Sequence, residues 1–434
     1  MKYALVNPKW NFEGSIYFGC REPHLPLEYG YSRLLLERAG HEVLIVDAQL
    51  EDLSLEEIRR RVARFGPDFT VITTAPSYLF WRCAPPELRV PQQTAARLRN
   101  DAGTLVVVGP HASTTTGAAL TKLGADLAIL GECEEILPML GWDWETVPSI
   151  GYRRNGVLCI NRGPHASDMS ALPSLTWPVD VIRRHRHHHH RFEAEPQGPG
   201  AEMETSRGCP YHCVFCAKDN FRDDYRKRPL ETILREIDGL IGTGVEYVYF
   251  IDEIFLPNRP LLEALAERRV KIGIQTRIDL WSVEMLELLG RAGCVSIEAG
   301  VESITEEGRE LLDKKCRLST GQIAERLIAA KQFVPFVQAN LLQMEADDRK
   351  AVEAWRQHLE QHGVWANKPV PFFVYPGSPE YQRRWGATDD YAWERAHEDY
   401  LQINDQFSDI QEQKPLPLVQ LELPQRESLR TRPK

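Results

Sequence analysis

The chain has 434 residues, a formal net charge of −10 and 43% hydrophobic residues. This length exceeds what one hydrophobic core usually serves, so we expect two domains with additional segments. The negative charge argues against nucleic-acid binding, which needs clustered Lys and Arg. No apolar run approaches the roughly 20 residues of a membrane span, and the N-terminus has no apolar signal-peptide core. Three of the nine cysteines are bunched and the others are scattered, unlike a secreted disulfide framework, so we expect a cytoplasmic protein.

Residues 1–140 alternate short apolar runs with amphipathic stretches, which predicts an α/β domain whose parallel sheet is covered on both faces. Ser54 and Glu57 have the spacing of a capping box at the start of one helix. The predicted strands are residues 3–7, 42–47, 69–74, 104–108 and 127–130, and the predicted helices are residues 27–39, 54–65, 86–101 and 113–123. Ligands of such sheets bind beyond the carboxyl ends of the strands. The loops at 7–8, 75–83, 109–113 and 131–132 are therefore the expected contacts.

Residues 141–200 read as a connector. Asn155-Gly156 between two alternating apolar runs predicts a β-hairpin. Residues 185–191, HRHHHHR, are open to three interpretations: a metal site, because imidazole suits zinc, copper and nickel, a lining of a substrate cleft, or a solvated or locally packed loop. Adjacent histidines cannot all face one ion, which counts against the first.

From residue 201 to 378 the strand–helix alternation resumes and predicts a partial parallel (β/α)6 barrel. The expected strands are residues 201–206, 245–251, 270–275, 294–299, 334–341 and 368–374, and the expected helices lie near 229–242, 258–268, 282–291, 305–314, 319–332 and 347–363. Chemistry in such barrels gathers at the carboxyl ends of the strands. We expect residues 379–434 to form a small helical region with an extended or disordered end.

The segment 205–220, TSRGCPYHCVFCAKDN, places Cys209, Cys213 and Cys216 in a C-x3-C-x2-C run after the first expected barrel strand. An iron–sulfur cubane normally takes four thiolates, so three would leave one iron open to a ligand. Zinc is the first alternative, but structural zinc usually takes two separated ligand pairs, and no second pair lies nearby. Disulfides are the second, but three close cysteines cannot all pair.

This run resembles the signature of the radical S-adenosylmethionine (SAM) enzymes. The resemblance implies a [4Fe–4S] cluster on the three cysteines, with SAM chelating the open iron and an aromatic residue, here Phe215, near its adenine. Asp252 and Glu253 match the acidic segment near the methionine ammonium, and Arg277 and Glu302 match positions that reach the ribose or carboxylate. Ser303 is a further candidate. The alternative for each charged residue is a structural ion pair at the barrel rim.

The first domain, with its segments LPLEYGYSRLLLERAGHEVLIVDA, VVVGPHAS and LAILGECEE, resembles the cobalamin-binding domain found ahead of many radical SAM domains. The resemblance implies a flavodoxin-like sheet that binds cobalamin at its strand ends. The candidate contacts are Ser77, Tyr78, Trp81, Gly109, His111, Gly131 and Glu132. Glycines let a backbone approach a ligand closely. The aromatic segment 78–82 either covers the lower face of the corrin or is interdomain core, and His111 either contacts the cofactor or braces its loop. The D-x-H-x-x-G motif is absent, so we expect cobalt without a histidine ligand.

The resemblance implies a cobalamin-dependent radical SAM methyltransferase that acts on an unactivated carbon of a small molecule. A reduced cluster cleaves SAM to a 5′-deoxyadenosyl radical, which abstracts hydrogen, and methylcobalamin supplies the methyl group. A cyclase or oxidative rearrangement enzyme with the same cofactors is the alternative. A non-catalytic cobalamin sensor is a third, but it would have no need of an open iron. A flavodoxin or ferredoxin is the implied electron donor.

Overall fold

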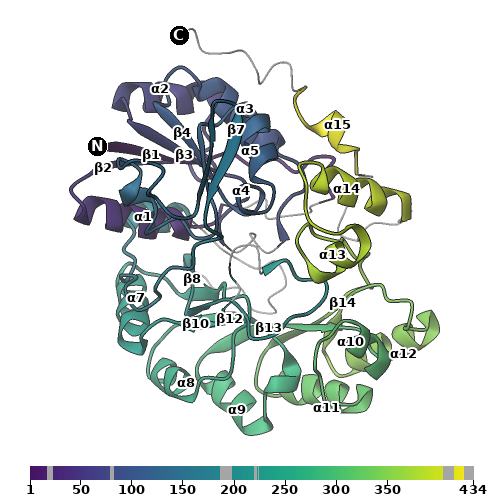
Figure 1. Cartoon of the computed structure of the whole chain (residues 1–434). Helices are drawn as coiled ribbons and strands as arrows, with labels where there is room; N and C mark the ends of the chain where they lie inside the picture. The colour runs from purple at the N-terminus through teal and green to yellow at the C-terminus, as the bar shows by residue number, and fades with distance from the viewer. Residues whose placement is uncertain are drawn as a thin grey trace.

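The structure is a computed structural model and describes residues 1–16, 23–78, 83–185, 198–218, 222, 224–403 and 415–424. Two α/β units lie one above the other, and C-terminal helices run along one side of both (Figure 1). Both predicted units are present.

The first unit contains a seven-stranded sheet in the order β2-β1-β3-β4-β5-β6-β7. Its strands are β1 (Lys2–Asn7), β2 (Glu42–Asp47), β3 (Phe69–Thr73), β4 (Thr104–Val108), β5 (Leu127–Ile129), β6 (Ile150–Arg154) and β7 (Val157–Asn161). Strands β1 to β5 are parallel. Their order, 2-1-3-4-5, is that of flavodoxin-like folds, in which ligands bind where the chain reverses direction beside β1. The predicted flavodoxin-like sheet is confirmed.

Helices cover both faces of this sheet because alternate strand residues point to opposite sides. Ala4 and Val6 pack on the face that holds α2 (Leu55–Phe65), α3 (Arg89–Leu98) and α5 (Thr116–Leu123). Tyr3 and Leu5 pack on the other face, with α1 (Leu27–Arg38). The predicted capping box of α2 is present, with Ser54 and Glu57 bonded reciprocally. The helix predicted at 113–123 is instead two short helices, α4 (Pro110–Thr114) and α5, separated at Thr115.

The predicted hairpin is formed by β6 and β7. Asn155 and Gly156 have φ values of 52° and 81°, the left-handed pair that a two-residue type I′ turn requires. Strand β6 also pairs antiparallel with β5, so the hairpin extends the first sheet. The hairpin that the sequence places in the connector is thus paired with the sheet of the first unit. The short helix α6 (Val179–Arg184) follows before the barrel.

The second unit is a six-stranded parallel sheet in sequence order, β8 (Gly200–Met203), β11 (Tyr247–Phe250), β12 (Lys271–Thr276), β13 (Cys294–Glu302), β14 (Phe336–Leu341) and β15 (Trp365–Ala366). Strands β8 and β15 are its two edges, so the barrel is open, as predicted. Its helices lie outside the curved sheet (Figure 1). They are α7 (Leu230–Gly242), α8 (Arg259–Ala266), α9 (Val283–Arg291), α10 (Glu306–Leu311), α11 (Thr320–Lys331) and α12 (Arg349–Gln361).

The two end strands of the barrel differ from the prediction. The sixth was expected at 368–374 but is only Trp365–Ala366, followed by a single bridge between Leu342 and Val370. Pro369 and Pro371 have no N–H to donate to a ladder, which explains the early end. The first was expected to reach residue 206, but it stops at Met203. Ser206–Arg207 instead forms β9, which pairs antiparallel with β10 (Arg226–Lys227).

The helical C-terminal region is confirmed by α13 (Pro379–Trp385), α14 (Ala392–Ile403) and α15 (Leu418–Leu421). It docks on the first domain through Lys122, which is 7% exposed. The Lys122 ammonium lies 2.6 Å from Glu394 Oε1 and 2.8 Å from Glu422 Oε2. The Leu416 amide donates to the Gly14 carbonyl oxygen at 2.7 Å. One lysine of the first domain thus holds two carboxylates of the C-terminal region.

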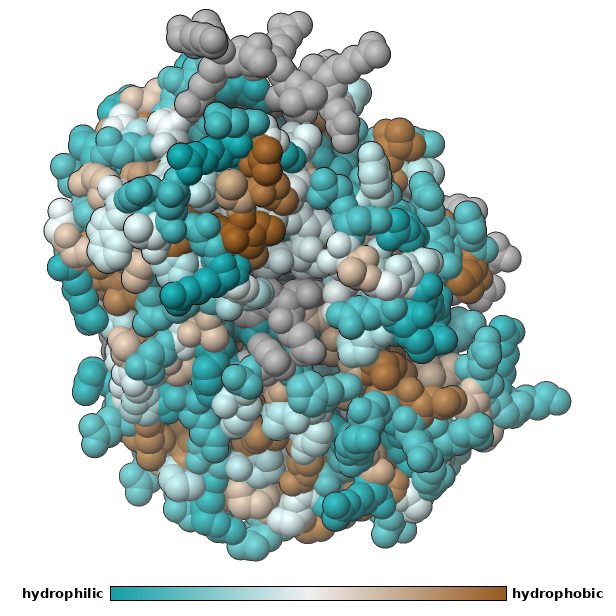
Figure 2. Space-filling view, viewed as in Figure 1, coloured by the Kyte–Doolittle hydropathy of each residue, from teal (hydrophilic) through white to brown (hydrophobic). Residues whose placement is uncertain are grey.

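The molecular surface seen in Figure 2 is mainly hydrophilic, with apolar side chains in small groups. Among the described residues, the most exposed large apolar side chains include Val419, Tyr391, Val157 and Trp142. In this part of the chain no helix has the length and apolar character that crossing a membrane requires.

We predict that Lys122→Met weakens the attachment of the C-terminal region. The substitution leaves Glu394 and Glu422 facing each other without their shared cation, at a cost of about 2 kcal/mol. A lower urea midpoint and faster proteolysis of the C-terminal region are the expected readouts. Lys2→Met is the control, because the Lys2 side chain is 41% exposed and its contacts with Glu42 and Phe65 lie at the surface. Equal midpoints for both variants would contradict the prediction.

Candidate functional site

The cysteine loop lies between β9 and β10, directly after the first barrel strand. Cys209, Cys213 and Cys216 are partly exposed, and none of them forms a disulfide. The loop is held by backbone hydrogen bonds: Val214 donates to Leu312 at 3.1 Å, and Glu380 donates to Val214 at 2.9 Å. Burial raises the pKa values of the Cys209 and Cys213 thiols. The loop is therefore fixed at the barrel mouth by two other segments of the chain.

The residues of this loop fit an iron–sulfur cluster better than a single ion. In the described part of the chain, no three His, Cys, Asp or Glu side chains are grouped to hold one metal ion. A [4Fe–4S] cluster binds each thiolate to a different iron, so its ligands need not meet at one atom. Three cysteines on one loop, with no disulfide among them, meet that requirement.

Asp252 and Glu253, at the end of β11, hold the cysteine loop. Asp252 is buried and accepts hydrogen bonds from the Thr205 amide at 2.7 Å and the Ser206 hydroxyl at 2.6 Å. Burial raises its pKa to about 7. Glu253 accepts from the Gly208 amide at 2.9 Å, one residue before Cys209. Both carboxyl groups are engaged within the protein, so the structure assigns them to the support of the loop.

Arg277, after β12, retains a free donor beside the cysteine loop. Its Nε and Nη2 atoms bond to Asp279 at 3.1 and 2.8 Å, and its guanidinium lies 4.1 Å from the ring centre of Tyr211, a residue of the loop. The remaining Nη1 is buried and has no hydrogen-bond partner among the residues described. A buried donor of this kind costs free energy unless a ligand satisfies it. Arg277 therefore suits an anionic ligand group.

Glu302 and Ser303 follow at the end of β13, where a bulge interrupts the ladder. Glu302 has a φ of 64°, and its Oε1 pairs with the Lys314 ammonium at 2.9 Å, so its Oε2 takes no part in that pair. Ser303 is fully buried, and its hydroxyl donates to Asp347 at 2.7 Å. Glu302 remains a ligand candidate, whereas Ser303 serves the turn before α10.

Phe215 packs edge-to-face on Phe372, with ring centres 6.4 Å apart.

The two candidate glycines at the carboxyl edge of the first sheet make close contacts within the protein. Gly109 has a φ of 112°, and a Cβ there would lie 2.5 Å from the Thr74 hydroxyl. Gly131 has a φ of 79°, and a Cβ would lie 2.3 Å from the His165 carbonyl oxygen. Both positions require glycine for the fold itself. The expectation that they make room for a ligand is not needed to explain them.

His111 braces the loop. It is buried, its Nε2 lies 2.8 Å from the Pro85 carbonyl oxygen, and its ring stacks on Trp393 of α14 with centres 4.0 Å apart. Burial lowers its pKa to about 3. Of the two interpretations left open, these contacts favour bracing.

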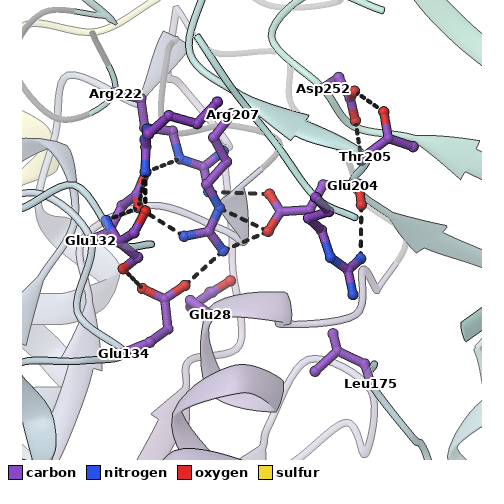
Figure 3. A network of polar contacts seen from close by, with 12 residues as sticks. Glu28, Glu132, Glu134, Leu175, Glu204, Thr205, Arg207, Arg222 and Asp252 are labelled. Atoms are coloured by element: carbon purple, nitrogen blue, oxygen red, sulfur yellow. Dashed lines mark hydrogen bonds and ion pairs between the residues drawn. The ribbon is translucent and has the colours of Figure 1, made fainter. Parts of the chain in front are cut away.

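Glu132 is part of a buried network of charges between the two domains (Figure 3). It accepts from Arg207 at 3.0 Å and from Arg226 at 2.6 Å. Burial alone would raise the pKa of Glu132, but the attraction of Arg207, with Arg226 and Arg222, holds it well below its usual range. Tyr78 belongs to the same network, with Arg222 over its ring at 3.9 Å. Glu132 and Tyr78, two of the candidate cobalamin contacts, thus lie between the two domains. For Tyr78 this agrees with the second of its two interpretations, an interdomain core residue.

Glu28, in the first turn of α1, is the unusual member of this region. It is fully buried beside the network, and neither carboxyl oxygen has a hydrogen-bond partner within the described chain. Burial raises its pKa to about 8. The side chain is therefore mostly protonated at neutral pH.

The remaining candidates are Ser77, Trp81 and the histidine run. Ser77 is buried in the loop after β3 with a φ of 26°. Trp81 and residues 186–191 lie outside the described residues. His185, the first of the run, is buried with its Nε2 3.1 Å from Glu202 on β8. For His185 the locally packed interpretation holds.

Sequence reasoning missed Arg207, Arg222 and Glu134, all fully buried in the network. Arg207 and Glu134 lie within the quoted segments TSRGC and LAILGECEE, next to residues that were singled out. Opposite charges in two loops that both meet the gap between the domains were the available signal. It was missed because each loop was read for its own ligand.

The comparisons with known proteins agree with this geometry. Residues 203–340 match the family model of the radical SAM superfamily. An uncharacterized methyltransferase of Pyrococcus horikoshii is 25% identical, with 77% of this chain and 72% of the relative covered. The anaerobic magnesium-protoporphyrin IX monomethyl ester cyclase of Cereibacter sphaeroides is also 25% identical, with 76% of this chain and 55% of the relative covered. The radical SAM methyltransferase TsrM of Kitasatospora setae, solved with cobalamin and a [4Fe–4S] cluster, superposes with a TM-score of 0.66 at 17% identity over 87% of this chain and 73% of that chain.

The matched residues contain the cysteine loop and most of the barrel strands, so this part of the chain is a radical SAM domain. The flavodoxin-like sheet and open barrel together have the fold of a cobalamin-containing radical SAM methyltransferase.

Glu28→Gln tests the protonated state of the buried carboxyl. The unfolded Glu28 loses its proton near pH 4.5 and the folded one near pH 8, so rising pH between these values favours the unfolded wild type. The amide cannot ionise, so the variant gains stability relative to wild type from pH 5 to 8, on the order of 3 kcal/mol. Urea midpoints at both pH values measure this. A stability difference that does not change with pH would contradict it.

Proposed function

We propose that this chain is a cobalamin-dependent radical SAM methyltransferase that methylates an unactivated carbon of a small molecule. The observation that carries the proposal is the cysteine loop, which places three cysteines without a disulfide at the barrel mouth and is joined through Arg207 to the carboxyl edge of the first sheet. The Pyrococcus relative is named a methyltransferase, and the structure of TsrM contains cobalamin and a cluster. Both support the assignment.

The side chains present fit the three groups that this function requires. Cys209, Cys213 and Cys216 would hold the cluster. The Nη1 of Arg277, which has no partner in the described chain, would donate a hydrogen bond to the carboxylate of SAM. At the end of β3 the buried Thr74 hydroxyl has no hydrogen-bond partner within the described chain, which suits a polar group of cobalamin. When bound, these groups supply an electron, a radical source and a methyl carrier.

The protein's own contribution is to position the groups and to exclude water. Asp252 and Glu253 fix the backbone before the first cysteine. Arg277 orients its ligand while Asp279 holds its other nitrogens. His111 is committed to Pro85 and Trp393, so it is not a cobalt ligand in this proposal. A flavodoxin or ferredoxin as electron donor and a cytoplasmic location belong to the same proposal.

A cyclase is the second candidate function. The relative from Cereibacter sphaeroides is named a cyclase and is as similar in sequence as the methyltransferase relative. The product of a cyclase would not gain the mass of a methyl group. Product mass with candidate small molecules therefore separates the two functions.

The proposal predicts one [4Fe–4S] cluster and one cobalamin per chain after anaerobic reconstitution. Replacing all three cysteines of the loop with Ala removes every proposed iron ligand, so the visible absorption of the cluster and the formation of 5′-deoxyadenosine should both be lost. The Cys159→Ala variant is the control, because Cys159 lies on β7 of the first sheet. 5′-Deoxyadenosine formation by the triple variant would refute the proposal.

Arg277→Met is expected to weaken SAM binding. Loss of a charge-assisted hydrogen bond costs roughly 1.5–3 kcal/mol, which is about a ten- to hundredfold rise in the SAM concentration for half-maximal 5′-deoxyadenosine formation. Iron content and the visible spectrum should be unchanged, since Arg277 is not an iron ligand. Arg268→Met, which removes a surface partner of Asp238, should behave as wild type. If the two variants have the same SAM dependence, Arg277 is only a rim residue.

A further inference from the structure

We propose that a buried arginine clamp couples the cofactor edge of the first domain to the cluster loop of the barrel. The clamp consists of Arg207 and Arg222 on the barrel side and Glu132 and Glu134 on the side of the first domain. This inference rests on the proposed function, because it requires both cofactors to bind. It adds that the two sites are energetically linked, with Arg207 as the positioning residue.

The two arginines lie at the two ends of the cysteine loop. Arg207 is two residues before Cys209, and Arg222 is six residues after Cys216. Both side chains are fully buried and point toward the same carboxylates (Figure 3). Arg207 lies 3.0 Å from Glu132 and 2.7 Å from Glu134, and Arg222 lies 3.4 Å from Glu132. Both ends of the loop are thus tied to one short segment of the first domain.

That segment follows β5 and belongs to the carboxyl edge of the first sheet, where ligands of this fold bind. A second edge loop joins the clamp through Tyr78, whose ring stacks on Arg207 at 4.6 Å and on Arg222 at 3.9 Å. The barrel closes the other side: Glu204 bonds to Arg207 at 2.8 Å, and Glu253 bonds to Arg222 at 2.8 Å. Each guanidinium therefore has carboxylate partners in both domains.

This arrangement can couple binding at one site to binding at the other, because the buried ion pairs tolerate little movement of either loop. A buried guanidinium that loses one carboxylate is left with an uncompensated charge, so the edge loops and the cysteine loop must shift together or not at all. If ordering of the cysteine loop by its cluster favours the edge conformation that binds cobalamin, the cluster tightens cobalamin binding. Linkage then requires cobalamin to stabilise the cluster by the same factor.

The test compares the affinity of the chain for hydroxocobalamin with and without a reconstituted cluster, by anaerobic equilibrium dialysis. In the wild type we expect the cluster to tighten binding about tenfold, within the range usual for coupled sites. In Arg207→Lys the ammonium keeps the charge but cannot reach three carboxylates in one plane, so the factor should fall below about twofold while iron content is retained. A merely structural role would weaken both affinities equally and leave their ratio unchanged.

Arg309→Lys is the matched control. Arg309 is a buried barrel arginine that bonds to the carbonyl oxygens of Ser303 and Leu318, and this variant should retain the wild-type factor. If Arg207→Lys does not fold, Glu134→Gln tests the clamp from the side of the first domain, with the same expected loss. Equal affinities with and without cluster in the wild type, or a retained factor in Arg207→Lys, would overturn the inference alone. Failure of both wild-type forms to bind hydroxocobalamin would overturn it together with the proposed function.

Discussion

Arg207 and Arg222 are fully buried between the two domains, and their need for counter-charges determines how the domains pack. A guanidinium in a low-dielectric interior costs several kcal/mol unless carboxylates surround it, and here those carboxylates come from both sides. Glu132 and Glu134 are supplied by the first domain and Glu204 and Glu253 by the barrel. Any other docking of the two domains would leave a buried charge unpaired, so the interface fixes one arrangement. The ion pairs of Lys122 with Glu394 and Glu422 attach the C-terminal region to the first domain.

This constraint explains why the candidate residues divide into two groups. Those nearest the interface, Glu132, Tyr78, Asp252 and Glu253, have their polar atoms or rings committed to holding the domains and the cysteine loop together. Arg277 after β12 and Thr74 after β3 each keep a buried polar atom that has no hydrogen-bond partner in the described chain. The proposed chemistry would take place between them, with the committed residues as the rigid frame.

Much of the fold could be predicted from the sequence because its signals are local. The capping box of Ser54 and Glu57, the turn at Asn155-Gly156 and the spacing of the three cysteines each lie within a few residues. The interface could not, because Glu132 and Arg207 are 75 residues apart and neither has a local pattern that names its partner. The role of Gly131 was also hidden, since the His165 carbonyl that excludes a side chain there comes from a distant segment. Pro369 and Pro371 have no N–H groups to donate to a strand ladder, so they indicate a short sixth strand in the sequence itself.

The role of cobalamin as a methyl carrier can be tested by following the methyl group of SAM. The reconstituted chain, loaded with hydroxocobalamin and reduced anaerobically, is given SAM with a deuterated methyl group, and the cobalamin is then extracted and weighed by mass spectrometry. We expect the extracted cobalamin to carry the deuterated methyl group, and we expect this product to form only when the chain is present. Formation of 5′-deoxyadenosine while the cobalamin stays unmethylated would contradict it, because the chain would then cleave SAM without using cobalamin as a methyl carrier.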